Sequence, residues 1–181
     1  MEFPDSNITA AEIDERALDF CRRSFDATSF LSKQRFSTLR LPRQFDLIWC
    51  GSLLTHVDER AARDLMHLFF QHLSHGGVCV VTTHGGLSME MLQRREVTYG
   101  LSDDAQKKVL QELRSKGYGY ADYDHRSSFG VSLVTHERMR QLAADVGGFE
   151  ETLFREHGWD NHQDVYAFGR GRQQKPESDT T

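Results

Sequence analysis

Residues 7–14, Asn-Ile-Thr-Ala-Ala-Glu-Ile-Asp, decide how the fold of this chain is interpreted. The segment indicates a buried strand over about 7–12 that ends at the acidic residue Glu12 and continues into a helix capped by Asp14. A carboxylate at the end of such a strand is placed to accept hydrogen bonds from both hydroxyls of a ribose. We therefore expect an inner strand of an open parallel sheet that binds a nucleotide-like ligand.

The residues before this strand are few, and none of them is glycine. Six residues precede it, and the first glycine of the chain is Gly51. In nucleotide-binding sheets of this kind, another strand and a glycine-rich turn come first. We therefore expect a fold that is truncated at its N-terminus. Its unpaired strand edges would then favour a homo-oligomer, because an open edge is a template for another chain.

Composition limits the classes of partner. A chain of 181 residues corresponds to about one domain, and a net charge of −5 gives no basic surface for nucleic acid or an anionic membrane. Its apolar runs are much shorter than the roughly 20 residues of a membrane span.

The three cysteines, Cys21, Cys50 and Cys79, are widely spaced. They predict reduced core thiols in a cytoplasmic protein, with neither a disulfide framework nor a metal site.

The middle of the chain alternates between strands and helices. Strands are predicted at about 28–31, at 45–50 and at 78–83, and Asp58 is predicted to cap the helix between the last two. Gly76-Gly77 is expected to end that helix. This order predicts an α/β fold with a doubly wound, mostly parallel sheet, because parallel neighbours need crossover connections.

The remainder of the chain departs from the alternation. Residues 86–128 are polar, with helices expected near 88–95 and 102–116, and we interpret them as a helical lid over the ligand-binding edge. After a helix capped by Thr135, strands at about 149–156 and 164–170 are separated by too short a loop for a crossover, so they form an antiparallel hairpin. We expect a single domain over 1–170 and a disordered tail over 171–181.

This pattern resembles the class I S-adenosylmethionine-dependent methyltransferase family. Residues 10–18 resemble its second-strand motif, residues 45–57 its fourth-strand motif, and residues 73–84 its fifth strand with the preceding helix end. The resemblance implies that Glu12 binds the ribose hydroxyls of S-adenosylmethionine, that Ile13 lies along the adenine, and that the end of the fourth strand lines the cofactor pocket. The remaining residues assigned to the cofactor are Ser32, Lys33, Cys50, Gly51 and Ser52.

Two histidines are the candidates for acid–base chemistry. His56 and His84 follow two strands that are expected to be adjacent and parallel, so both can face one cleft. Either is a candidate general base, because imidazole titrates near neutral pH. Methyl transfer from a sulfonium requires at most one deprotonation, so both are also explained as polar residues at the start of a loop. The polar segment 158–164 and the tyrosines near 118–123 remain alternative contacts for a substrate.

Three functions stay open at this point. The first is methyl transfer from S-adenosylmethionine to a small molecule. The second is a cofactor-deficient remnant that acts as a binding module, because the glycine-rich motif is absent. The third is a nicotinamide-dependent oxidoreductase, which the closing hairpin disfavours, since a dinucleotide fold needs a second parallel half. Whether the chain is an enzyme is therefore undecided from the sequence.

Overall fold

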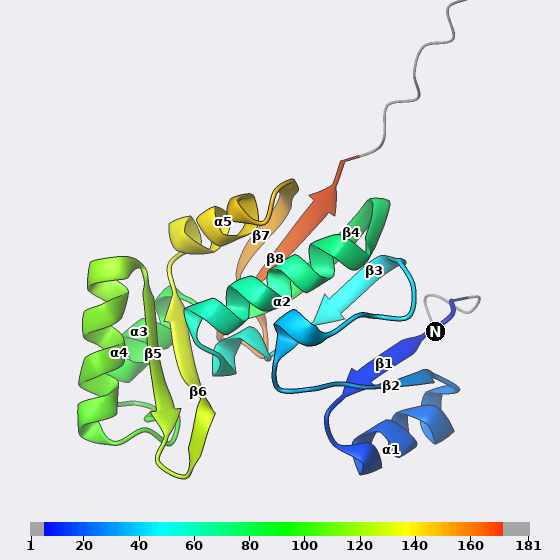
Figure 1. Ribbon diagram of the computed structural model, residues 1–181. Helices are drawn as coiled ribbons and strands as arrows, with labels where there is room; N and C mark the ends of the chain where they lie inside the picture. The colour runs from blue at the N-terminus through cyan, green and yellow to red at the C-terminus, as the bar shows by residue number, and fades with distance from the viewer. Residues whose placement is uncertain (1–5, 172–181) are drawn as a thin grey trace, which may run out of the picture. The chain divides into compact units, whose positions relative to one another are not determined.

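The computed structural model describes residues 6–171, apart from the side chain of Arg126 (Figure 1). The predicted disordered tail lies outside this range except for Gly171. The chain divides into two compact units, residues 6–43 and 44–171, and each is described by itself. The prediction of one domain over 1–170 remains a prediction.

The first unit is a small parallel strand–helix–strand motif. Strand β1 (Thr9–Glu12) leads into helix α1 (Glu15–Phe25) and strand β2 (Thr28–Leu31), and a 3-10 turn, η1 (Phe36–Thr38), follows. The two strands are parallel, with Glu12 opposite Leu31 at their carboxyl ends. The predicted strand ending at Glu12 is therefore confirmed.

The ends of α1 follow from local chemistry. The side chain of Asp14 accepts hydrogen bonds from the backbone N–H groups of Arg16 and Ala17, which otherwise lack partners in the first turn. At the other end Asp26 adopts a left-handed conformation with φ of 52°. That conformation ends the helix and is one that residues other than glycine seldom adopt.

The second unit is built on a four-stranded mixed sheet in the order β3-β4-β8-β7 (Figure 1). Strand β3 (Phe45–Cys50) is parallel to β4 (Leu73–His84), and β8 (Gln163–Arg170) is antiparallel to both β4 and β7 (Phe149–Trp159). The antiparallel closing hairpin is confirmed. The expected role of Gly76-Gly77 is wrong, because helix α2 (Glu59–His72) ends earlier and both glycines lie within β4.

One face of this sheet holds the core of the second unit. Its inward side chains are in register across three strands, with Ile48 of β3 opposite Cys79 of β4, and Cys79 opposite Phe168 of β8. All three are buried. Helices α2 and α5 (His136–Asp145) pack against strands of this sheet and against each other. The alternate residues Leu47 and Trp49 of β3 are about half exposed.

The insertion is partly a β-structure, which the sequence analysis did not predict. Helices α3 (Gly86–Gln93) and α4 (Asp103–Lys116) match the two expected helices, but an antiparallel hairpin of β5 (Tyr118–Tyr123) and β6 (Arg126–Val134) follows them. Helices and hairpin share a hydrophobic core of their own. Its buried members are Leu92, Leu101, Val109, Leu113, Ala121, Val131 and Leu133.

All three cysteines are free thiols, and Cys50 and Cys79 are buried. Within residues 6–171, no helix combines the length and the apolar character that crossing a bilayer requires.

Candidate functional site

The carboxyl ends of β3 and β4 bring the two predicted histidines together. His84 is the last residue of β4. His56 ends a 3-10 turn, η2 (Leu54–His56), in the loop after β3. This edge of a parallel pair is where ligands bind in open α/β sheets. The expected juxtaposition is therefore present, while a catalytic role for either residue remains a prediction.

Strand β6 fixes the protonation pattern of both rings. Nδ1 of His56 lies 2.8 Å from the carbonyl oxygen of Gly130, and Nδ1 of His84 lies 3.1 Å from that of Ser132. A carbonyl oxygen can only accept, so Nδ1 of each ring carries the hydrogen. In the neutral ring, Nε2 is then an unprotonated acceptor.

The spacing of these anchors sets the spacing of the histidines. Gly130 and Ser132 are alternate residues of one strand, so their carbonyls face the same side about 7 Å apart. One edge of β6 pairs with β5. The carbonyls of Gly130 and Ser132 lie on the opposite edge of β6, and they accept hydrogen bonds from the two histidines. Strand β6 therefore positions the two rings beside each other at the sheet edge.

Burial separates the two histidines chemically. His84 is only 4% exposed. That burial lowers its pKa to about 4, although the carbonyl of Ser132 opposes the shift. At neutral pH His84 is therefore an uncharged hydrogen-bond acceptor and a poor proton acceptor. His56 is partly exposed, so its ring is accessible to a ligand.

Aromatic rings surround both imidazoles. His56 stacks on Phe129 at a centroid distance of 4.8 Å, and the hydroxyl oxygen of Tyr123 lies 3.3 Å from its Nδ1. His84 clusters with Tyr99, at 4.6 Å, and His162, at 5.6 Å, and these two rings are 6.3 Å from each other. Such stacking fixes ring orientation, so neither imidazole has to be ordered when a ligand arrives.

The loop after β3 is held by an unusual set of hydrogen bonds. Ser52 has a φ of 60°, and its N–H donates to Thr82 Oγ1 at 2.7 Å. Thr82 Oγ1 donates to Gln163 Oε1 at 2.7 Å, and Gln163 Nε2 donates to Ser52 Oγ at 2.9 Å. These bonds close a ring that joins the loop after β3 to strands β4 and β8.

Cys50 and Gly51, the two residues before Ser52, offer no polar side-chain group to a ligand. The thiol of Cys50 faces the core, and burial raises its pKa to about 12, so its side chain is not available to a ligand. Gly51 lies against the indole of Trp49, because a Cβ at this glycine would be 3.0 Å from Trp49 Cζ2. Of this predicted trio, Ser52 alone presents a side-chain polar group at the edge of the sheet.

The first unit gathers its own predicted residues at one edge. Oε1 of Glu12 accepts from the N–H groups of Ile13 (2.6 Å) and Asp14 (3.1 Å). Its Oε2 makes no further hydrogen bond among residues 6–171. The N–H of Ser32 donates to the carbonyl oxygen of Glu12 at 2.7 Å, which places Ser32 and the exposed Lys33 beside the same strand end.

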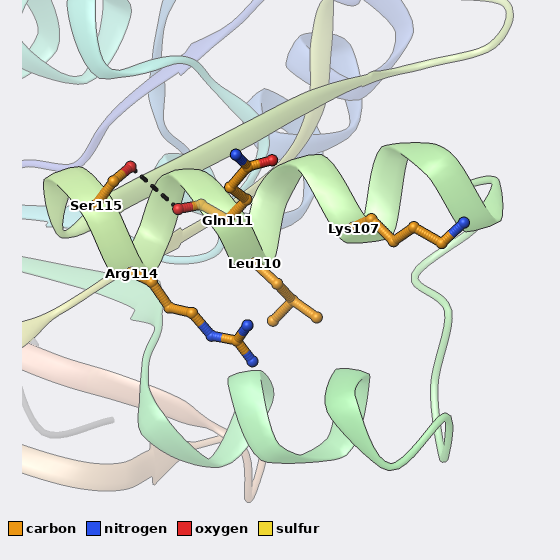
Figure 2. Close-up of a pocket in the computed structure, with 5 residues that line it drawn as sticks. All are labelled: Lys107, Leu110, Gln111, Arg114 and Ser115. Atoms are coloured by element: carbon orange, nitrogen blue, oxygen red, sulfur yellow. Dashed lines mark hydrogen bonds between the residues drawn. The ribbon is translucent and has the colours of Figure 1, made fainter.

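A groove on the surface of α4 contains none of these residues. It has a volume of about 450 Å³ and is lined by Lys107, Leu110, Gln111, Arg114 and Ser115 (Figure 2). Figure 2 shows the side chains of Leu110 and Arg114 reaching from α4 toward α3. No catalytic group borders this groove, so the chemistry is assigned to the sheet edge.

Sequence reasoning missed several residues of this site. Thr82 lay within the motif 73–84 without an assigned role, Phe129 carried no motif, and Gln163 lay unassigned within the polar segment 158–164. The density of polar residues in that segment was the available signal. Within residues 6–171, no group of three or more histidine, cysteine or acidic side chains is arranged to hold a metal ion.

Comparisons with known proteins identify the fold. No protein-family model matches the sequence, and no curated protein does. Among solved structures, the chain is similar to the PH0226 protein of Pyrococcus horikoshii, with 14% identity and a TM-score of 0.63 over 93% of this chain and 74% of that one. It is similar to an S-adenosylmethionine-dependent methyltransferase of Methanosarcina mazei, with 15% identity and a TM-score of 0.61 over 92% and 83% of the two chains.

A human enzyme is also similar. For N-acetylserotonin methyltransferase, solved in complex with S-adenosylmethionine, the identity is 16% and the TM-score is 0.58, over 94% of this chain and 42% of that one. The chain thus spans less than half of the human enzyme. At these identities the likeness establishes architecture. This chain has the α/β fold of the class I S-adenosylmethionine-dependent methyltransferases.

Proposed function

We propose that this chain transfers a methyl group from S-adenosylmethionine to a small-molecule acceptor, with His56 as the general base. The observation that carries the proposal is the bond from His56 Nδ1 to the carbonyl of Gly130, which makes Nε2 the acceptor nitrogen of the neutral ring in a partly exposed residue. The methyltransferase fold supports the reaction class.

Glu12 and its neighbours suit the adenosyl part of this cofactor. In the first unit, the unused Oε2 of Glu12 suits the two hydroxyls of a ribose. Ile13 is 52% exposed and offers an apolar surface to a planar base, with Ser32 and Lys33 at its border. In the second unit, Gly51 and the hydroxyl of Ser52 stand at the carboxyl end of β3.

The histidines take different roles in this proposal. When bound, the cofactor supplies an activated methyl group on a sulfonium. His56 Nε2 then accepts the proton of an acceptor hydroxyl or amine, a task suited to an accessible imidazole. His84 remains neutral because burial lowers its pKa to about 4. It therefore takes no proton at neutral pH and acts as a buried polar group behind the site.

A non-catalytic binding module is the main rival, and a nicotinamide-dependent oxidoreductase is the weaker one. The antiparallel pairing of β7 with β8 argues against the latter, because a dinucleotide fold continues with parallel strands. The neighbour LepI was solved with S-adenosylmethionine, and another neighbour is described as a pericyclic reaction enzyme. The fold therefore also accommodates chemistry other than methyl transfer.

Calorimetry tests the cofactor part of the proposal. The full chain is titrated with S-adenosylhomocysteine and, separately, with NADH. We expect saturable binding of S-adenosylhomocysteine, loss of affinity in Glu12→Ala, and no heat with NADH. Glu15→Ala, an exposed acidic residue of α1, is the matched control and keeps wild-type affinity. Absence of S-adenosylhomocysteine binding would overturn the proposed function.

A further inference from the structure

We propose that Thr82 and Gln163 are positioning residues that hold Ser52 in place and leave its hydroxyl hydrogen for the cofactor. This inference rests on the proposed function, because it names how one contact to that ligand is prepared. It is carried by the closed ring of hydrogen bonds among Ser52, Thr82 and Gln163.

The backbone of Ser52 is held in an uncommon conformation. Its φ of 60° lies in the left-handed region, which side chains other than glycine rarely occupy. Strained backbone of this kind persists where the surroundings over-determine it. Here the N–H of Ser52 is held by Thr82 Oγ1, and its carbonyl oxygen accepts from Thr55 Oγ1 at 2.7 Å.

Each hydrogen bond of the ring has a fixed donor and a fixed acceptor. Gln163 Oε1 can only accept, so the hydroxyl hydrogen of Thr82 is committed to it. Gln163 Nε2 can only donate, so Ser52 Oγ is an acceptor within the ring. No bond of the ring uses the hydrogen of the Ser52 hydroxyl, and none uses the second hydrogen of Gln163 Nε2.

Two of the three side chains of the ring are buried. Thr82 is fully buried at 0% exposure, and Gln163 is 4% exposed. Buried polar groups need their partners, because water cannot replace a lost bond, so the ring keeps one direction. Ser52 itself is partly exposed. The buried amide of Gln163 thus orients the Ser52 hydroxyl, whose hydrogen can be donated to a ligand at the carboxyl end of β3.

One variant of Gln163 and a matched pair at Thr82 test the inference. Gln163→Glu keeps the shape but replaces the donor to Ser52 Oγ with an acceptor, so the Ser52 hydroxyl turns inward to donate to it. We expect S-adenosylhomocysteine to bind about 3- to 10-fold more weakly in calorimetry, the effect of losing one net hydrogen bond. Thr82→Val removes the acceptor of the Ser52 N–H, whereas Thr82→Ser retains it and should restore wild-type affinity.

Amide hydrogen exchange at Ser52 provides a readout that needs no ligand. Protection at Ser52, relative to the global stability of each variant, should be lost in Thr82→Val and retained in Thr82→Ser. With any acceptor that is turned over, Gln163→Glu should raise the KM for S-adenosylmethionine and leave kcat unchanged, because the lost contact is equal in ground and transition states.

The outcomes separate the two proposals. Wild-type binding together with equal binding by Gln163→Glu would overturn the positioning role and leave the proposed function standing. Failure of the wild type to bind S-adenosylhomocysteine would overturn the proposed function and, with it, the role of the Ser52 hydroxyl. Unchanged Ser52 exchange in Thr82→Val would show that Thr82 does not hold this residue, whatever the ligand does.

Discussion

The carboxylate of Asp164 lies directly against the backbone of Gly85, so that a Cβ atom at this glycine would stand 1.7 Å from Asp164 Oδ2. Asp164 is buried, and its Oδ1 accepts from the N–H of His157 at 3.1 Å. Gly85 is the residue that precedes α3. The absence of a side chain at Gly85 therefore allows the β7–β8 hairpin to pack against the start of α3, next to His84.

We predict that Gly85→Ala destabilises the protein by about 1–3 kcal/mol, the usual cost of overpacking a filled site. Gly86→Ala is the matched control, because nothing lies within 4 Å of a Cβ at that position, and it should be neutral or slightly stabilising. Denaturant unfolding of the two variants measures the difference. The double variant Gly85→Ala with Asp164→Gly should recover part of the loss, and equal stability of the two single variants would refute this packing.

Acid should destabilise the fold through His84. Its folded pKa of about 4 lies below the unfolded value of 6.5, so between these values the unfolded state binds a proton that the folded state does not. Stability is therefore complete above pH 6.5, falls as the pH drops toward 4, and levels off below. The loss amounts to about 3 kcal/mol.

Denaturant unfolding at pH 7 and pH 4 measures this dependence. His84→Asn keeps a donor for the carbonyl of Ser132 and removes the titrating ring, so most of this acid loss should disappear. His75→Asn, at an exposed position, should show the same pH dependence as the wild type. A wild-type pH dependence in His84→Asn would mean that another group is responsible.

The elements that were predicted correctly owe their form to local chemistry. The near-continuous apolar run 45–50 forms β3, and Thr135 caps α5 by accepting from the N–H of Arg138. The β5–β6 hairpin was missed because Gly119 and Gly130 suggest a loop. Both glycines are required by long-range packing, since a Cβ at Gly119 would lie 2.0 Å from the carbonyl oxygen of Val109.

In the candidate site too, the features set by local sequence were predicted and those set by contacts between distant segments were not. The ends of strands were visible in the sequence, so Glu12, His56 and His84 were identified as candidates. The groups that orient them come from other strands, such as Gln163, which is 111 residues from Ser52. Such partners carry no local pattern, because strand order and register alone bring them together.

The first unit offers a stability prediction of its own. Asp26 ends α1 with φ of 52°, and its carboxylate lies at the negative end of the helix dipole. Asp26→Gly should therefore stabilise α1 by about 1 kcal/mol. Asp19→Gly, the same exchange within the helix, should destabilise it by a similar amount. Hydrogen exchange of the α1 amides measures both, and the same sign for both would contradict the account.

Methyl transfer itself tests the central claim. The full chain is incubated with methyl-labelled S-adenosylmethionine and a panel of small hydroxyl and amine acceptors, beside His56→Asn, which keeps a donor for the carbonyl of Gly130, and His67→Asn, at an exposed position. We predict transfer by the wild type and His67→Asn, and transfer slower by about 10²- to 10⁴-fold in His56→Asn with S-adenosylhomocysteine affinity unchanged. Transfer at the wild-type rate by His56→Asn, or no transfer by the wild type to any acceptor, would contradict it.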